Sequence, residues 1–170
     1  MSCRVYLAMK MTGLKAQEIT AKSDRAIEAM LKWGLDPISP WEKEKHLYKP
    51  DEVVVAGEKD LYEMWKQDKD EVMSCDVLCD IDGHLFSRGS SVETGFMRFG
   101  LMRPTLFIDP AFVSIRTFEA DCVAQSVEQA ASIIARRWGT WGKRIRWRLR
   151  VVWFPKTVFK RVYREFLSWR

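Results

Sequence analysis

Hydrophobic and polar positions follow two periodicities along this chain. Short apolar runs predict strands, and longer segments with apolar residues at helical spacing predict helices. Strands are predicted at residues 4–9, 34–40, 76–81, 104–109 and near 118–123, and helices near 15–33, 58–74, 90–100 and 126–138. Strands that alternate with helices predict an α/β fold, a doubly wound, mostly parallel five-stranded sheet of the Rossmann or flavodoxin-like kind with both faces covered. Residues 41–57 are charged and interrupted by proline, so we expect a loop there.

Charge divides the chain into two parts. The 170 residues carry a net charge of +5, but residues 136–170 contain 12 Lys and Arg against one acid, Glu165, which gives +11. Since the chain has 28 basic and 23 acidic residues in all, residues 1–135 keep 16 and 22 of them, a charge of −6. We therefore predict an α/β domain over residues 1–135 and a basic, Trp-rich C-terminal extension over residues 136–170.

The extension has no catalytic spacing, and its role stays open between three interpretations. Residues 143–153 alternate between apolar and Arg side chains, as in a strand, and residues 156–170 have apolar positions at helical spacing. The extension could pack against the body or a second subunit and leave its basic face in water. It could instead contact nucleic acid, with Arg on phosphates and Trp stacked on bases. Adsorption to an anionic membrane surface is the third possibility.

Neither a membrane span nor an exported protein is expected. No apolar run approaches the roughly 20 residues of a membrane-spanning helix, and the start of the chain enters a predicted strand without the pattern of a signal peptide. The cysteines form no Cys-x-x-Cys pair and have no accompanying histidine pattern; they are Cys3, Cys75, Cys79 and Cys122. We therefore expect reduced thiols in a cytoplasmic protein, with no metal site and no cofactor.

One aspartate interrupts an apolar stripe. In the predicted helix 58–74 the stripe passes through position 68 to Val72, and position 68 is Asp68, whereas Asp60 and Asp70 fall on the polar side. A carboxylate that faces a core needs partners or a shifted pKa, because burial disfavours its charge. The alternative is a stripe that ends early, with Asp68 in water. We expect the helix of Asp68 to end beside the loop 82–89.

A second acid follows a short run of small residues. Gly89, Ser90 and Ser91 precede Glu93, just after the predicted strand 76–81. Glycine permits close backbone approach, and serines at a helix start can cap it and leave amides that suit a phosphate. In open α/β sheets, ligands bind at the carboxyl ends of the strands, where this loop is predicted. The alternative is that Glu93 is an acid in the first helical turn that only complements the helix dipole.

These motifs resemble the nucleoside 2-deoxyribosyltransferase superfamily, which includes the 2'-deoxynucleoside 5'-phosphate N-hydrolases. The family signature is close to D-x-G-T-A-x-E-x-G, and this chain has "DIDG" at 80–83 followed by "SRGSSVETG" at 87–95. Gly89, Glu93 and Gly95 match in place. The first strand with its tyrosine, the "GLDPISP" turn and the interval from Asp68 to the next strand match as well, so the resemblance covers about residues 4–135.

Two positions depart from the family pattern. Met97 stands where the family usually has alanine, and "GLMRP" at 100–104 is longer than the usual Gly-Lys-Pro. We expect the end of this helix to be reshaped, with the catalytic glutamate unaffected.

The resemblance implies an N-glycosidase that works without a cofactor. Glu93 would be the nucleophile at C1' of a 2-deoxyribosyl group, because a carboxylate stabilises an oxocarbenium-like state and can form a covalent ester. Tyr6, expected at the carboxyl end of the first strand, would donate a hydrogen bond to Glu93, unless it is an ordinary core tyrosine. Asp68 would be the second acid, bonding the sugar or relaying a proton to the leaving base.

Position 87 favours one branch of the family. The transferases commonly have aspartate there and the nucleotide hydrolases serine, and this chain has Ser87, which can donate to a phosphate that an aspartate would repel. Charge and amides for the phosphate are also expected from Arg88, from Lys10 and from Thr12 and Gly13, although Lys10 and Arg88 could simply be solvated.

The sequence thus predicts hydrolysis of (2'-deoxy)nucleoside 5'-monophosphates to free base and sugar phosphate. Gly89, Ser90, Ser91 and Asp82 complete the predicted substrate-binding set. The alternatives are a 2-deoxyribosyltransferase that exchanges bases between nucleosides, and a non-catalytic nucleotide-binding module. The partner is expected to be a small nucleotide or nucleoside, and the resemblance implies a homo-oligomer, usually a dimer.

Overall fold

A computed structural model of the chain describes residues 2–55, 61–83, 85, 88–111 and 120–139, with the backbone alone at 61–65, 67 and 88. Its centre is one parallel sheet. The strands are β1 (Arg4–Ala8), β2 (Asp36–Ile38), β3 (Val77–Asp80), β4 (Thr105–Ile108) and β5 (Cys122–Ala124). They lie in the order β2-β1-β3-β4-β5, and each of the four neighbouring pairs is parallel. This order is the flavodoxin-like one, so the predicted fold class is confirmed.

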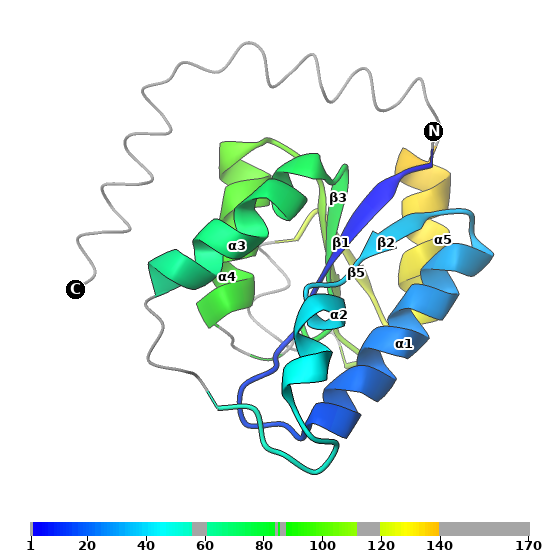
Figure 1. Ribbon diagram of the computed structural model, residues 1–170. Helices are drawn as coiled ribbons and strands as arrows, with labels where there is room; N and C mark the ends of the chain where they lie inside the picture. The colour runs from blue at the N-terminus through cyan, green and yellow to red at the C-terminus, as the bar shows by residue number, and fades with distance from the viewer. Residues whose placement is uncertain (1, 56–60, 84, 86–87, 112–119, 140–170) are drawn as a thin grey trace.

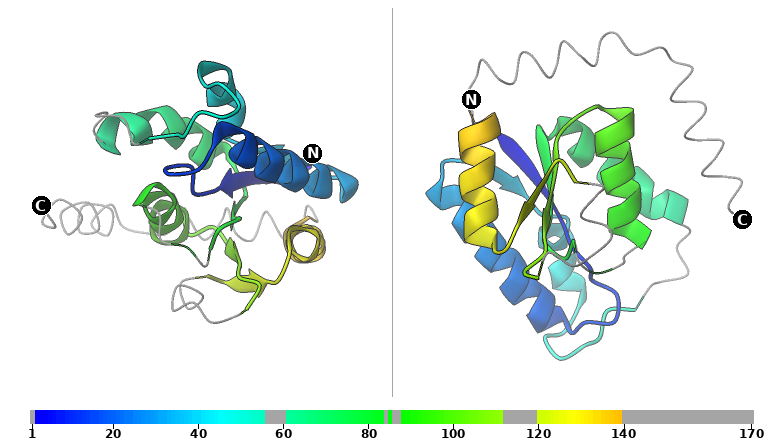
Figure 2. Two further views of the ribbon diagram at one scale, coloured as in Figure 1. Left: turned by 90° about the horizontal axis from the view of Figure 1, so that it is seen from below. Right: turned by 180° about the vertical axis from the view of Figure 1, so that it is seen from behind.

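Helices cover both faces of the sheet (Figures 1 and 2). The helices α1 (Ala16–Lys32) and α5 (Val127–Trp138) pack together on one face, and α3 (Leu61–Ser74) and α4 (Arg88–Gly95) on the other. Each face has its own apolar core, and Tyr6, Ala8 and Val72 belong to the one beneath α3 and α4. Because β1 is covered on both faces, its apolar residues need not alternate with polar ones.

The segment predicted as a loop, 41–57, contains a short helix instead. The helix α2 (Trp41–Glu44) runs into a 3₁₀ turn, Lys45–Leu47. Trp41 is fully buried; its indole N–H donates to Thr20 Oγ1 at 2.9 Å, and its ring stacks on Tyr48. This large aromatic side chain holds α2 against α1, in spite of the charged residues around it.

The helix after β3 also differs from its predicted bounds. The sequence predicted residues 90–100, whereas α4 begins at Arg88 and continues into a π-helical turn, Phe96–Gly100. Met102 follows with a φ of 52°, and the Arg103 amide donates to the Met97 carbonyl at 2.9 Å. This irregular helix end coincides with the "GLMRP" segment at residues 100–104.

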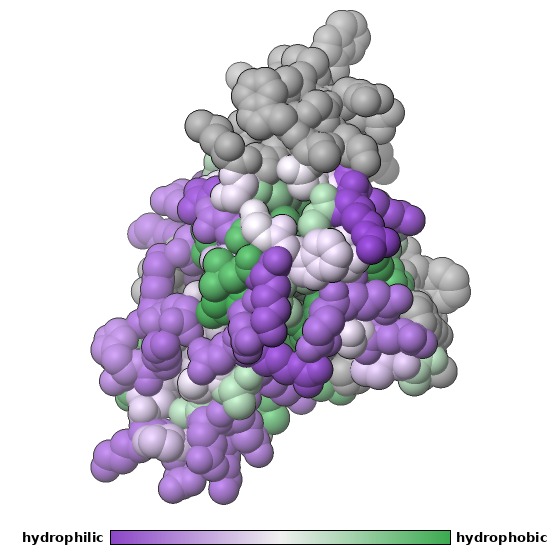
Figure 3. Space-filling view, turned by 90° about the vertical axis from the view of Figure 1, so that its right-hand side faces the viewer, coloured by the Kyte–Doolittle hydropathy of each residue, from purple (hydrophilic) through white to green (hydrophobic). Residues whose placement is uncertain are grey.

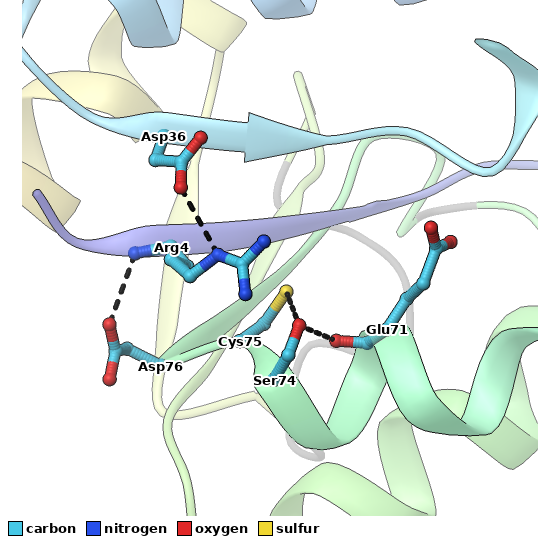
Figure 4. Close-up of polar contacts among 6 residues, drawn as sticks. All are labelled: Arg4, Asp36, Glu71, Ser74, Cys75 and Asp76. Atoms are coloured by element: carbon cyan, nitrogen blue, oxygen red, sulfur yellow. Dashed lines mark hydrogen bonds and ion pairs between the residues drawn. The ribbon is translucent and has the colours of Figure 1, made fainter.

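Polar contacts tie the amino ends of the strands to the end of α3 (Figure 4). Arg4 bonds Asp36 through its Nε at 3.1 Å, and its backbone amide donates to Asp76 Oδ2 at 3.1 Å. The Arg103 guanidinium donates to the carbonyls of Met73 and Cys75 and so satisfies the end of the helix. The last turn of α3 is therefore fixed at the amino edge of the sheet.

The outer side of the α1 and α5 layer is mostly hydrophilic, with apolar atoms visible between long polar side chains (Figure 3). All four cysteines are free thiols, and three of them are buried. Among the helices that the structure describes, none is long and apolar enough to cross a membrane. The helix α5 continues past residue 135 to Trp138, which is buried; the remainder of the predicted extension, residues 140–170, lies outside the described residues.

Close packing at Gly83 gives a first prediction. A Cβ at this position, just after β3, would lie 2.5 Å from Phe107 Cβ, which belongs to the fully buried core. We expect Gly83→Ala to reduce the free energy of unfolding by about 1–3 kcal/mol, the usual cost of overpacking. Urea unfolding measures this, with Gly95→Ala as a control for an added methyl group without a clash, because a Cβ there meets no atom within 4 Å. Equal stability of wild type and Gly83→Ala would contradict the prediction.

Candidate active site

The candidate site lies at the point where the winding of the sheet reverses. The chain passes from β1 to β2 on one side and then crosses to β3 on the other side of β1. The loops that follow β1 and β3 therefore diverge at the carboxyl edge, which is where open α/β sheets bind ligands. The helix α4 starts from this edge.

Glu93 and Tyr6 meet between the sheet and α4. The Tyr6 hydroxyl donates to Glu93 Oε1 at 2.8 Å, and Tyr6 is fully buried while Glu93 is 9% exposed. Tyr6 stands in the middle of β1, not at its carboxyl end as expected, and its long phenol spans the gap to α4. Because α4 begins at Arg88, Glu93 lies in its second turn, outside the first turn where an acid would complement the helix dipole.

Burial dominates the ionisation of this pair. Removal from water raises the pKa of Glu93 to about 8; the Tyr6 hydrogen bond lowers it, and the charges of Asp68 and Asp80 raise it. The pKa of Tyr6 is raised well above its ordinary value, first by burial and then by the charges of Glu93 and Asp68. Tyr6 therefore keeps its proton near neutral pH and can donate it in the hydrogen bond to Glu93.

Asp68 approaches the same pair from α3. Its side chain is half-buried, whereas Asp70, two residues further along the helix, is exposed. The pKa of Asp68 is raised to about 6, chiefly by burial and then by Glu44 and Glu71, while Lys43 lowers it. The expectation that its helix ends beside the loop 82–89 is wrong, since α3 ends at the opposite edge of the sheet. Asp68 comes near Glu93 because it lies midway along α3, which packs against α4.

Two further charged residues, which the sequence did not single out, form an ion pair beside Asp68. Lys43 of α2 lies with its Nζ 2.5 Å from Glu71 Oε1 on α3, and Glu71 is one of the charges that raise the pKa values of Asp68 and Tyr6. A signal for Glu71 existed, because residues three apart on a helix share a face, and Glu71 follows Asp68 by three. The sequence contains no comparable signal for Lys43, since its segment was interpreted as a loop.

Asp82 holds the loop after β1. It is 5% exposed, and its two carboxylate oxygens accept from the Lys22 ammonium at 2.9 Å and from the Lys10 amide at 3.1 Å. The Gly13 amide donates to the Val54 carbonyl at 2.8 Å. The bond to Val54 corrects the expectation that the Gly13 amide is offered to a phosphate. The Lys10 ammonium makes no ion pair with a residue that the structure describes, and Thr12 is exposed.

The start of α4 differs in detail from the prediction. Ser90 and Ser91 do not cap the helix but lie in its first turn, together with Gly89, and Ser90 is buried. Arg88 is the first helical residue, and only its backbone is described; Ser87 lies outside the described residues. The first-turn amides of α4 remain at the carboxyl edge of the sheet, where a helix start attracts anions.

Within the part of the chain that the structure describes, no group of three or more His, Cys, Asp or Glu side chains is arranged to hold a metal ion. The arrangement can do acid–base and nucleophilic chemistry instead. One buried carboxyl is oriented by a phenol, and a second carboxyl with a different pKa lies near it, which is how paired acids divide their roles.

Comparisons with known proteins agree with this fold. No family model matches the chain, and no curated protein sequence matches it. One similar solved structure is a 2-deoxyribosyltransferase of Bacillus psychrosaccharolyticus, described as a biocatalyst for the synthesis of nucleosides; it has a TM-score of 0.55 and 18% identity over 76% of this chain and 90% of that one. Another is a conserved protein of Enterococcus faecalis V583, with a TM-score of 0.53 and 13% identity over 81% of this chain and 99% of that one. At these identities, the similarity of this chain to the two structures shows a shared fold only.

Proposed function

We propose that this protein is a member of the nucleoside 2-deoxyribosyltransferase superfamily that hydrolyses the N-glycosidic bond of (2'-deoxy)nucleoside 5'-monophosphates. The observation that carries the proposal is the buried Glu93 carboxyl, hydrogen-bonded to Tyr6 at the reversal point of the sheet. Two facts support it: the fold is shared with a 2-deoxyribosyltransferase, and Glu93 lies in the family's signature motif.

The chemistry follows from the two carboxyls. Ionised Glu93 attacks C1' through the oxygen that does not bond Tyr6; a C1'–O bond forms and the C1'–N bond breaks. The electron pair of the broken bond stays on the base, which takes a proton from Asp68. Water then attacks C1', the ester to Glu93 breaks, and the proton of that water returns to Asp68. Each turnover releases free base and sugar phosphate and restores both acids.

The working state holds one proton in the pair, on Asp68. The free protein favours the other arrangement, since burial raises the pKa of Glu93 to about 8 and that of Asp68 only to about 6. The positive charge that develops at C1' as the C1'–N bond breaks stabilises ionised Glu93 and opposes this preference. Burial thus disfavours the ionised nucleophile in the free protein.

The monophosphate is favoured by the groups near the start of α4. The first-turn amides and the Lys10 ammonium offer positive potential at the carboxyl edge, and Ser87 in the sequence has no charge to repel an anion. Transfer of 2-deoxyribose to a second base is the other candidate, and the shared fold with a 2-deoxyribosyltransferase favours it. The two reactions share the Glu93 ester and differ in the acceptor.

Release of free base from a panel of nucleosides and their 5'-monophosphates tests the proposal. We expect release from at least one monophosphate in water alone. A second set of reactions contains a competing free base. Formation of a new nucleoside only when that base is present would establish the transferase instead, and no release from any member of the panel would overturn both.

The phosphate preference gives a prediction at Ser87. We expect Ser87→Asp to lower kcat/KM for a monophosphate by about 10-fold or more and to leave that for the nucleoside within about threefold, because a new carboxylate repels the phosphate. Ser87→Ala is the matched control that removes the hydroxyl without adding charge. Equal kcat/KM values of wild type for nucleoside and monophosphate would contradict the assignment of the phosphate site.

A further inference from the structure

The contact between α2 and α3 contains an acid that is only half satisfied. Glu71 Oε1 pairs with Lys43, but Glu71 Oε2 is buried without a hydrogen-bond partner among the described residues. The Glu71 side chain is 18% exposed, whereas the Lys43 side chain that pairs with it is mostly exposed. Figure 4 shows the Glu71 side chain extending from α3 away from the Ser74, Cys75 and Asp76 end of the helix.

This arrangement is costly for a surface contact. A buried acceptor without a partner loses the free energy of its hydration. An ion pair with an exposed lysine offsets only a small part of this free energy. The neighbouring pair, Lys45 and Glu42 at 2.7 Å, shows the ordinary case, because both of its side chains are well exposed and no carboxylate oxygen of Glu42 is stranded. Glu71 therefore needs an explanation that Glu42 does not.

We propose that Glu71, anchored by Lys43, is a positioning residue that fixes a negative charge beside Asp68 and so keeps a proton on the acid that serves the leaving base. The inference deepens the proposed function and rests on it. Glu71 does not touch the reacting atoms in this scheme. It acts through Asp68, one helical turn away on the same face of α3.

The charged and titratable groups around Asp68 come from four elements. Glu44 and Lys43 face it from α2 and Glu71 lies on its own helix. Across the site, Asp68 acts on Glu93 of α4 and Tyr6 of β1. Glu71 raises the pKa of Asp68 and Lys43 lowers it, so the two partners of one ion pair have opposite effects on the same acid.

Because Glu71 and Lys43 shift the pKa of Asp68 in opposite directions, replacing each of them should move the titration of Asp68 in opposite directions. Carboxyl carbon NMR of the full-length protein follows the titration of Asp68 in wild type, Glu71→Gln and Lys43→Met. We expect the Asp68 midpoint to fall in Glu71→Gln and to rise in Lys43→Met, each by roughly half a unit or more. The controls Glu42→Gln and Lys45→Met break the neighbouring exposed pair and should leave the Asp68 midpoint unchanged. If Glu71→Gln does not fold, Lys43→Met alone decides, since Lys43 is exposed.

The pH profile of base release gives the second readout. In Glu71→Gln the acid limb of kcat/KM should move to lower pH, together with the Asp68 midpoint, which a merely structural role of Glu71 would not cause. Unchanged Asp68 midpoints in both variants would overturn the inference, whatever the activity. Opposite shifts of the midpoint without any base release by the wild type would uphold the effect of Glu71 on Asp68 and refute the proposed function.

Discussion

Replacing Glu93 by glutamine is expected to lower base release by roughly four orders of magnitude or more while the protein stays folded and still binds substrate. The amide keeps the size of the side chain but cannot form the ester to C1', so the reaction loses its covalent intermediate. Single-turnover release of base measures the chemical step, and calorimetric titration with the monophosphate measures binding. Glu93→Ala should be equally inactive.

The same variant should gain stability at alkaline pH. Because the pKa of Glu93 rises from 4.5 to about 8 on folding, the folded state binds more protons than the unfolded one between these values, and stability falls as pH rises through that window. Glutamine cannot ionise and escapes this loss, which is of the order of a few kcal/mol above pH 8. Thermal unfolding at pH 5 and pH 8.5 compares the two proteins. Normal turnover by Glu93→Ala, or a Glu93→Gln protein that is less stable at pH 8.5, would refute the assignment of a buried nucleophile.

Replacing Asp68 by asparagine should slow turnover by roughly 10²- to 10⁴-fold, the usual effect of losing a general acid. In wild type, kcat/KM should be bell-shaped, rising near pH 6 and falling near pH 8, because activity requires one proton shared by the pair. In Asp68→Asn the alkaline fall should disappear. The remaining rise should lie below pH 8, since the Asp68 charge that raises the pKa of Glu93 is absent.

Asp70→Asn is the matched control for this experiment. Asp70 belongs to the same helix, but its side chain is exposed. Its replacement should leave kcat/KM within about twofold of wild type and the bell-shaped pH profile of kcat/KM unchanged, as for most surface substitutions. Equal losses of kcat/KM in the two variants would show that Asp68 is not the proton donor. An unchanged bell-shaped pH profile in Asp68→Asn would show the same.

Most of the fold could be predicted from the sequence, because the apolar runs are bounded by clear turns. The positions of β1, β3, β4 and α1 agree with the predicted ranges within a few residues. The helix α2 was missed because a single buried side chain, Trp41, stabilises it, and periodicity cannot be detected in four residues. The early start of α4 at Arg88 was missed because the small residues after it were interpreted as the cap.

The candidate site could be predicted only in part. Glu93 and Asp68 stand out in sequence because one follows a glycine- and serine-rich turn and the other interrupts an apolar stripe. The hydrogen bond from Tyr6 joins residues 87 positions apart and was expected only from the family resemblance. The ion pair of Lys43 with Glu71 depends on where α2 docks, and no local pattern contains that information. The engagement of the Gly13 amide likewise depends on a distant partner, Val54.

The π-helical turn Phe96–Gly100 has a consequence for how chain length varies in such proteins. A π-helical turn closes i→i+5 hydrogen bonds and so holds about one more residue than an α-helical turn. The turn follows Glu93, and the Arg103 amide after it donates to the Met97 carbonyl within it. The helix before the turn and this hydrogen bond after it thus hold both ends of the segment in place. A lineage could gain or lose residues here without moving the carboxyl that the chemistry needs. A change of chain length in this turn is therefore expected to disturb Glu93 less than a change of length in the segment before it.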